Sequence, residues 1–167
     1  MKKMMLLLVV AFSTLTYCTD AQTPKSPRVT AEGKDVKVSY GQPSKRDREI
    51  FGGLVPYGQV WRTGANEATE ITFTKDVKIA GKDVKAGTYT LFTIPTENDW
   101  TIILNSQLKQ WGAYDYEKHK GKDVLQVKVP FKKVNNSVEA LTYRFDNNNQ
   151  LLIEWDKTQV AIPIANR

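Results

Sequence analysis

EITFTKDVKIAGKDVKAGTYTLFTIP, residues 70–95, alternates apolar and polar side chains with a period of two. Such alternation is typical of a β-strand that buries one face and exposes the other. Pairs of turn-forming residues interrupt the alternation at Lys75-Asp76, Gly81-Lys82 and Ala86-Gly87. The segment therefore predicts three short strands, near 70–74, 77–79 and 88–94.

The same period continues on both sides of this segment. VTAEGKDVKVSY (29–40) predicts a hairpin around Gly33-Lys34, with Val36, Val38 and Tyr40 on one face. Further strands are predicted at 100–105, 124–130, 139–146, 151–156 and 159–164.

No segment from 29 to 164 holds a helical period of 3.6 residues beyond about one turn, and the best candidate is NSQLKQWG (105–112). About ten short strands with turn signals between them are typical of an antiparallel sandwich or barrel. We therefore predict an all-β fold: a single antiparallel β-sandwich or barrel-like domain, jelly-roll-like in its connections, over residues 29–165. The long loop 41–68 is expected to pack over one end of it.

The N-terminus has the pattern of an export signal. Lys2 and Lys3 precede an apolar run that continues to Leu15 and is too short to span a membrane. Thr19 and Ala21 are small residues at the −3 and −1 positions of a cut before Gln22. The sequence thus predicts a signal peptide at 1–21, a Pro-containing linker at 22–28, and a periplasmic or extracellular protein.

A second processing route stays open, because LTYC (15–18) resembles a bacterial lipobox that would leave a lipidated Cys18. Tyr17 is bulky where that motif has a small residue, which favours the cut after Ala21. Cys18 is the only cysteine of the chain, so the mature domain has no disulfide in either case. No later segment is apolar for long enough to span a membrane.

The formal net charge of the whole chain is +6. The lysines are scattered through turns and do not form a stripe, which is typical of a soluble surface, although a positive protein could also attract anionic envelope polymers. No aromatic-basic module for nucleic acid occurs, so no nucleic-acid partner is predicted. The oligomeric state is left open.

WRTGANE (61–67), between two predicted strands, is the principal candidate for a binding site. Arg62 is a planar donor for a carboxylate, phosphate or sulfate, and Trp61 offers a flat apolar wall on which a sugar ring could stack. Asn66 can donate and accept hydrogen bonds, and Glu67 is a charged acceptor. Gly58 and Gly64 are expected to let the backbone turn sharply.

An architectural interpretation of the same segment is equally open at this point. Arg62 and Glu67 could form a buried ion pair that pins the long loop, with Asn66 capping a turn and Trp61 filling the end of the sandwich. A mixed arrangement, in which Arg62 is anchored by Glu67 on one side and open on the other, is what we expect.

LKQWGAYDYEKHKGKD (108–123) is a second candidate, because its aromatic residues are not spaced as in a strand. Trp111 could form the rim of a glycan- or peptide-binding surface, or fold back as a lid over the core. SKRDRE (44–49) alternates in charge and is typical of a solvated turn, from which Arg46 or Arg48 could reach an anionic ligand.

Familiar catalytic motifs are missing from the sequence. His119 is the only histidine and lies in a lysine-rich stretch, which argues against a catalytic triad or a histidine zinc site. No phosphate-binding loop or dinucleotide-binding motif occurs, so no metal and no cofactor are predicted. A hydrolase that pairs Glu67 with a second carboxylate, such as Asp115 or Glu70, stays conceivable.

Three stretches together resemble one protein family: residues 39–95, from SYGQPSKRDRE to TLFTIP, then WTIILN (100–105) and QWGAY (110–114). The chain from about Pro27 to Ile164 is similar to the DUF2911 family, exported proteins of mainly Bacteroidetes-type bacteria. The resemblance implies export and one domain, and it implies no known chemistry.

Three functions remain as hypotheses. The first is a non-catalytic exported module that binds a small polar or glycan-like ligand through Trp61, Arg62, Asn66 and Glu67, with Trp111 at the rim. The second is a hydrolase that uses Glu67 as acid or base and Arg62 to stabilise charge. The third is a structural protein of the cell envelope.

We expect the mature chain to begin at Gln22, because Thr19 and Ala21 fit signal cleavage better than LTYC fits lipidation. Mass spectrometry of the protein purified from its native membrane and soluble fractions tests this. An acylated Cys18 at the N-terminus would contradict it.

Overall fold

A computed structural model describes residues 26–167 of this chain. The expected signal peptide (1–21) and Cys18 lie outside the described residues, as does most of the expected linker. The first strand begins at Arg28, the last residue of that linker.

The strands of the described residues form one nine-stranded antiparallel sheet in the order β1-β2-β3-β6-β7-β8-β9-β4-β5. The sheet is not closed into a barrel. A single helical turn, α1 (Tyr116–His119), is followed by a 3-10 turn at Lys120–Lys122. The strands are β1 (Arg28–Gly33), β2 (Val36–Gly41), β3 (Thr69–Phe73), β4 (Val77–Ile79), β5 (Lys82–Val84), β6 (Gly87–Pro95), β7 (Asp99–Asn105), β8 (Asp123–Phe145) and β9 (Gln150–Asn166).

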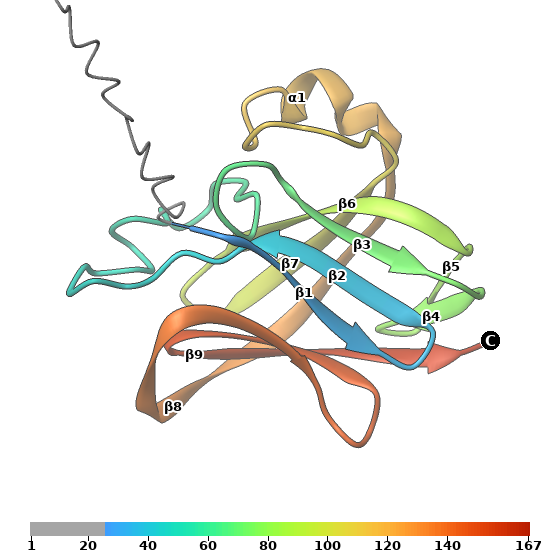
Figure 1. The fold of residues 1–167 in the computed structure, drawn as a ribbon. Coiled ribbons are helices and arrows are strands. Elements are labelled where there is room, and N and C mark those ends of the chain that lie inside the picture. The colour runs from blue at the N-terminus through green and yellow to red at the C-terminus, as the bar shows by residue number, and fades with distance from the viewer. Residues whose placement is uncertain (1–25) are drawn as a thin grey trace, which may run out of the picture.

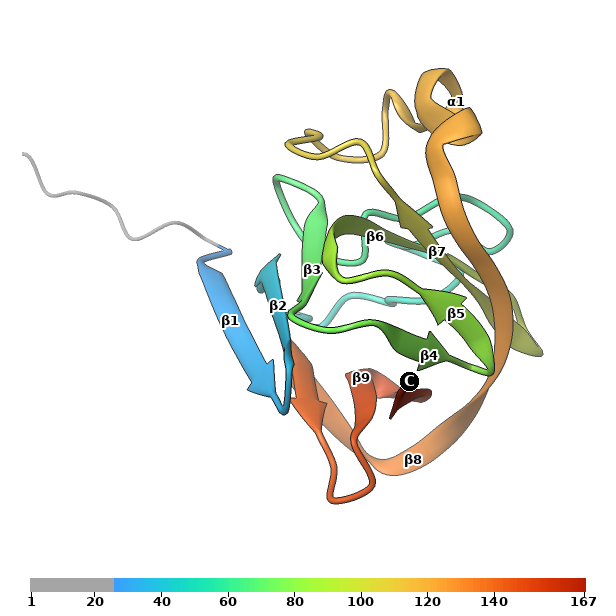
Figure 2. The same ribbon diagram turned by 90° about the vertical axis from the view of Figure 1, so that its right-hand side faces the viewer.

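The long strand β8 turns this sheet into two layers. Its residues up to Pro130 pair with β7, and from Phe131 onward it pairs with β9. The second half of β8 and strand β9 thus lie under the layer that β1, β2, β3, β6 and β7 form (Figure 1). Figure 2 shows the same arrangement from the side, with the β4–β5 hairpin against β9. The predicted all-β, sandwich-like antiparallel fold is confirmed.

The core lies between the two layers and follows the predicted period of two. Val36, Val38 and Tyr40 on β2 are buried, while Lys37 between them is exposed. β9 contributes Leu151, Ile153 and other alternate residues to the same cluster. Burial of such apolar side chains, at about 25 cal/mol per Å², is the main force that stabilises the domain.

The structure corrects the predicted strands in three places. The strands predicted at 124–130 and 139–146 are one continuous strand, and those at 151–156 and 159–164 are another. The polar residues after Lys133 form a bulge and not a turn, because residues 131–133 before them and 138–145 after them both pair with β9. β5 was not predicted, and the helical turn lies at 116–119 instead of 105–112.

The connection between β2 and β3 packs over one end of the sandwich, as predicted for loop 41–68. These two strands are neighbours, yet the chain between them leaves the sheet and crosses from one layer to the other. Lys45 donates a backbone hydrogen bond to Glu139 on β8, and Trp61 exchanges two with Thr93 on β6. The loop is therefore tied to both layers.

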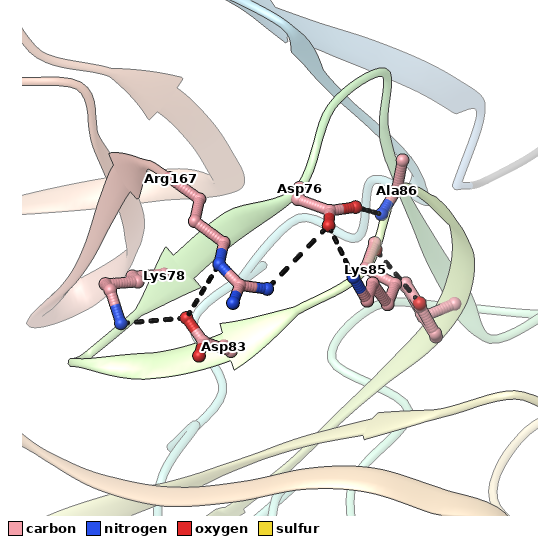
Figure 3. Close-up of polar contacts among 7 residues, drawn as sticks. Asp76, Lys78, Asp83, Lys85, Ala86 and Arg167 are labelled. Atoms are coloured by element: carbon pink, nitrogen blue, oxygen red, sulfur yellow. Dashed lines mark hydrogen bonds and ion pairs between the residues drawn. The ribbon is translucent and has the colours of Figure 1, made fainter.

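A group of ion pairs fixes the β4–β5 hairpin to the end of the chain (Figure 3). Asp76 accepts hydrogen bonds from the Lys85 side chain and the Ala86 N–H, at 2.8 and 2.9 Å. Arg167 lies 3.9 Å from both Asp76 and Asp83. These groups are exposed, so the network orients the hairpin and adds little to stability.

One ion pair between β8 and β9 is less exposed to solvent, and it predicts that the stability of the protein depends on pH. Arg144 donates two hydrogen bonds to Glu154, at 2.7 and 2.8 Å, and holds the pKa of that carboxyl below its ordinary value of 4.5. A carboxyl with a lowered folded-state pKa stabilises the protein above its unfolded-state pKa, and this stabilisation is lost as the pH falls through the folded-state value.

We therefore expect Glu154→Gln to lower the melting temperature at pH 7, by an amount that shrinks as the pH falls below about 4.5. Thermal unfolding monitored by circular dichroism at a series of pH values tests this. Glu97→Gln is the control, because that side chain is exposed and takes part in no ion pair among residues 26–167. A difference between wild type and Glu154→Gln that is constant down to pH 2 would contradict the interpretation.

Candidate functional site

The WRTGANE segment follows a backbone path that differs in part from the expected one. Gly58 has a φ of 73°, a left-handed conformation that favours glycine, and its N–H donates to Pro95 O. Gly64 does not have a positive φ, whereas Thr63 and Asn66 do, at 53° and 61°. A sharp turn at Gly58 is thus confirmed, and the turn expected at Gly64 is made by its neighbours.

Glycine is needed at position 64 for a different reason: the backbone of the WRTGANE segment comes very close to that of β2. The Ala65 N–H donates to Gly41 O at the end of β2, at 3.1 Å. A Cβ at position 41 would lie 2.1 Å from Ala65 O, and one at position 64 would lie 2.9 Å from Thr69 Oγ1. Only glycine at both positions lets the segment lie directly on the end of β2.

Thr63 is the most constrained residue of the segment. It is fully buried, and a positive φ is unfavourable for a β-branched residue. Its carbonyl accepts hydrogen bonds from Thr69 Oγ1 at 2.9 Å and from the Tyr143 hydroxyl at 2.7 Å. Its own hydroxyl lies 3.0 Å from Thr93 Oγ1. These contacts hold the strained backbone and so fix the direction of the preceding residue, Arg62.

Trp61 both packs against the core and borders open space. Its ring stacks on Trp155 at 5.9 Å with an interplanar angle of 15°. It also meets Trp100 and Phe51 edge to face, each at 6.0 Å. The expectation that Trp61 fills the end of the sandwich is thus met, and its partly exposed side forms a wall of the neighbouring cavity.

That cavity, which we call the Arg62 cavity, has a volume of about 290 Å³. It lies between the 41–68 loop and β9, at the end of the sandwich. Its walls combine aromatic, aliphatic and basic side chains with exposed backbone, and no aspartate or glutamate is among them. The lining residues are Ser26, Pro43, Arg48, Leu54, Val55, Trp61, Arg62, Gly64, Ala65, Asn66 and Trp155.

The Arg62 side chain has no partner in the described part of the chain. Its Nε atom is buried and makes no hydrogen bond to any residue from 26 to 167. None of the ion pairs among these residues includes it. A buried donor without a partner costs about 1–3 kcal/mol, more for a charged group, so such an arrangement calls for an explanation.

Two further polar side chains stand at the edge of the cavity. Arg48 is exposed and is held in place by hydrogen bonds from its guanidinium to Lys45 O at 2.9 Å and Ser44 O at 2.6 Å. Asn66 donates to Ser26 O at 3.2 Å. The cavity therefore carries two arginines and an amide with no compensating carboxylate, and its potential is positive.

Glu67 does not belong to this group, and the expected pairing of Arg62 with Glu67 is wrong. The Glu67 carboxylate is half-exposed and lies 3.9 Å from Arg28 at the start of β1. The positive φ at Asn66 turns the chain, so that the side chains on its two sides leave in different directions. Glu67 pairs through its backbone with Trp111.

Trp111 is not a lid over the core, because 61% of its surface is exposed. It does not line the Arg62 cavity either. Of the remaining lining residues, Arg48 was suggested by the charge pattern of 44–49. Trp155 could not be recognised from the sequence as a residue that lines a cavity, because it continues the alternation of an ordinary strand.

The carboxylates considered for hydrolysis are engaged elsewhere. Glu70 accepts a hydrogen bond from the Lys109 N–H at 3.1 Å. The hydrogen bond from Lys118 lowers the pKa of Asp115, whereas a general acid needs a raised one. Within residues 26–167 no group of three or more histidine, cysteine, aspartate or glutamate side chains could hold a metal ion. Nor does any helix there have the length and apolarity needed to cross a membrane.

Comparison with protein families gives one match, to the family described as "Protein of unknown function (DUF2911)", over residues 23–164. The chain belongs to the DUF2911 family. The matched region includes every residue that lines the Arg62 cavity, and the WRTGANE segment lies in its first third. No curated protein and no solved structure matches the chain.

The contact between β2 and the WRTGANE segment yields a stability prediction. Gly41→Ala would place a methyl group 2.1 Å from Ala65 O, so we expect the free energy of unfolding to fall by about 1–3 kcal/mol. Chemical denaturation measures this. Gly121→Ala is the matched control, because nothing lies within 4 Å of its Cβ and its effect should be small. Equal stability of the two variants would contradict the close backbone contact.

Proposed function

We propose that this protein is an exported, non-catalytic binding module whose Arg62 cavity takes a small anionic ligand. The observation that carries the proposal is the Arg62 side chain, which lines a cavity free of carboxylates and whose buried Nε has no partner in the described residues. An anionic group on a ligand would satisfy this donor and offset the cost of burying it.

The walls of the cavity define the chemical class of the ligand. A planar guanidinium binds a carboxylate, phosphate or sulfate through two parallel hydrogen bonds. Trp61 supplies an apolar surface beside it, on which the face of a sugar ring can stack. A volume of about 290 Å³ is at the small end of ligand pockets. These features favour a sugar acid or sugar phosphate of one ring.

The other two hypotheses receive less support. An unpaired, buried guanidinium does not stabilise a purely structural protein. A network in which every polar group is hydrogen-bonded would stabilise such a protein better. A glycosidase-like hydrolase needs two carboxylates on either side of the scissile bond, whereas the lining of the Arg62 cavity contains none. The proposal of export rests on the signal-like residues 1–21 and their small-residue cut.

We expect the mature protein to bind glucuronate or glucose 6-phosphate more tightly than glucose, as measured by isothermal titration calorimetry. Arg62→Gln should weaken binding of the anionic sugar about 10- to 100-fold, because a hydrogen bond to a charged group contributes about 1.5–3 kcal/mol. Arg167→Gln is the matched control, since that arginine pairs with Asp76 and Asp83 at the other end of β9.

The stability of the same variant tests the reason for this effect. Because Arg62 Nε has no partner in the described residues, Arg62→Gln should leave the melting temperature of the ligand-free protein unchanged or raise it. A loss of several degrees, together with equal affinity for glucose and glucuronate, would show that Arg62 is architectural and would refute the proposed function.

A further inference from the structure

Trp111 and Tyr114 are two exposed aromatic residues in the loop between β7 and α1. Their side chains are 61% and 78% exposed, the two highest values among the large hydrophobic residues described. Neither ring packs against another aromatic ring of the described residues. Single exposed apolar side chains are common, but two large rings three residues apart are a candidate binding surface.

The loop that carries these rings is tied to the domain at both ends. On one side the Gly112 N–H donates to Asn66 O at 3.0 Å, and the Ala68 N–H donates to Gln110 O at 2.9 Å. On the other side Tyr116 is buried, and its hydroxyl donates to Asp123 at 2.7 Å. The exposed rings thus stand on a backbone that is held in one conformation, and little ordering entropy remains to oppose binding.

Gly112 also orients one of the rings. A Cβ at this position would lie 2.7 Å from the Tyr114 ring, and the φ of 66° favours glycine as well. The Tyr114 ring therefore lies against the Gly112 backbone with its other side in solvent. A larger residue at 112 would displace the ring.

The groups around the two rings identify the class of partner. Glu67 pairs with Trp111 through its backbone, and its half-exposed carboxylate lies 3.9 Å from Arg28. Asp115 follows Tyr114 directly, Lys118 lies three residues further on, and both are exposed. A membrane or nucleic-acid surface would favour basic residues alone, and a stable protein interface would favour a larger apolar centre.

Flat rings flanked by acceptors and donors of both signs instead fit a sugar chain. The apolar face of a sugar ring stacks on an aromatic ring, while its hydroxyls form hydrogen bonds with carboxylates and ammonium groups at the edge. We propose that Trp111 and Tyr114 form a stacking platform for the rings of a neutral polysaccharide chain.

This platform goes beyond the proposed function and does not depend on it. Neither Trp111 nor Tyr114 lines the Arg62 cavity. The two sites are nevertheless joined through one residue, because the Asn66 side chain lines the cavity while its carbonyl accepts the hydrogen bond from Gly112. A protein that holds a polymer at the platform would keep the cavity close to that polymer.

Affinity electrophoresis in native gels that contain laminarin, hydroxyethyl cellulose or xylan tests the platform. We expect at least one of the three polysaccharides to retard the mature wild-type protein. Trp111→Ala and Tyr114→Ala should each weaken this retardation about 3- to 10-fold, and Trp111→Phe should retain most of it because a flat ring remains. Tyr57→Ala is the matched control, since Tyr57 is also exposed, at 41%, but lies on a different loop. Circular dichroism melts confirm that every variant folds.

The outcomes separate the two sites. Loss of retardation in Trp111→Ala and its persistence in Arg62→Gln support the platform, whatever the cavity binds. The platform is refuted if none of the three polysaccharides retards the wild type, or if Trp111→Ala migrates as the wild type does. It is equally refuted if only Arg62→Gln loses retardation, which would place the sugar in the cavity.

Discussion

The stacking of Trp61 on Trp155 is the interaction on which the rest of the site depends. Trp155 lies on β9, and Trp61 exchanges backbone hydrogen bonds with Thr93 on β6, so this one contact joins the loop to both layers of the sandwich. Phe51 and Trp100 add edge-to-face contacts around it. Aromatic pairs of this kind contribute about 0.5–1.5 kcal/mol each beyond the area that they bury. The loop is thereby held by aromatic packing in addition to its backbone hydrogen bonds to β2, β6 and β8.

A loop held in this way can carry groups that would not stay in place elsewhere. Thr63 keeps an unfavourable backbone conformation because three buried hydroxyl contacts surround it. Arg62, the preceding residue, keeps a buried Nε with no partner in residues 26–167. Both features lower the stability of the folded protein. Proteins commonly keep such destabilising groups where a ligand is bound. Two such features in adjacent residues, beside a cavity lined by two arginines and no acid, support the proposal that this end of the sandwich binds a ligand.

The candidate site was predictable in part. The glycine-bracketed polar segment between two alternating stretches contains Trp61, Arg62 and Asn66, and all three line the cavity. The pairing of Arg62 with Glu67 was predicted wrongly, because the positive φ at Asn66 reverses the chain and leaves Glu67 beside Arg28. Trp155 could not be recognised at all, since a buried strand residue has the same pattern whether or not a cavity lies above it. Similarly, the continuity of β8 was hidden by polar residues that form a bulge where a turn was expected.

The sequence by itself determined the all-β class and the face of each strand that is buried, because these follow from a period of two and from turn residues that act locally. Only the tertiary structure decided which charges meet. Whether an arginine finds a carboxylate depends on contacts between segments far apart in the chain, such as Gly41 with Ala65 or Trp61 with Trp155. No local pattern encodes such contacts, so the same seven residues, WRTGANE, were compatible with a closed ion pair until the packing placed Arg62 and Glu67 apart.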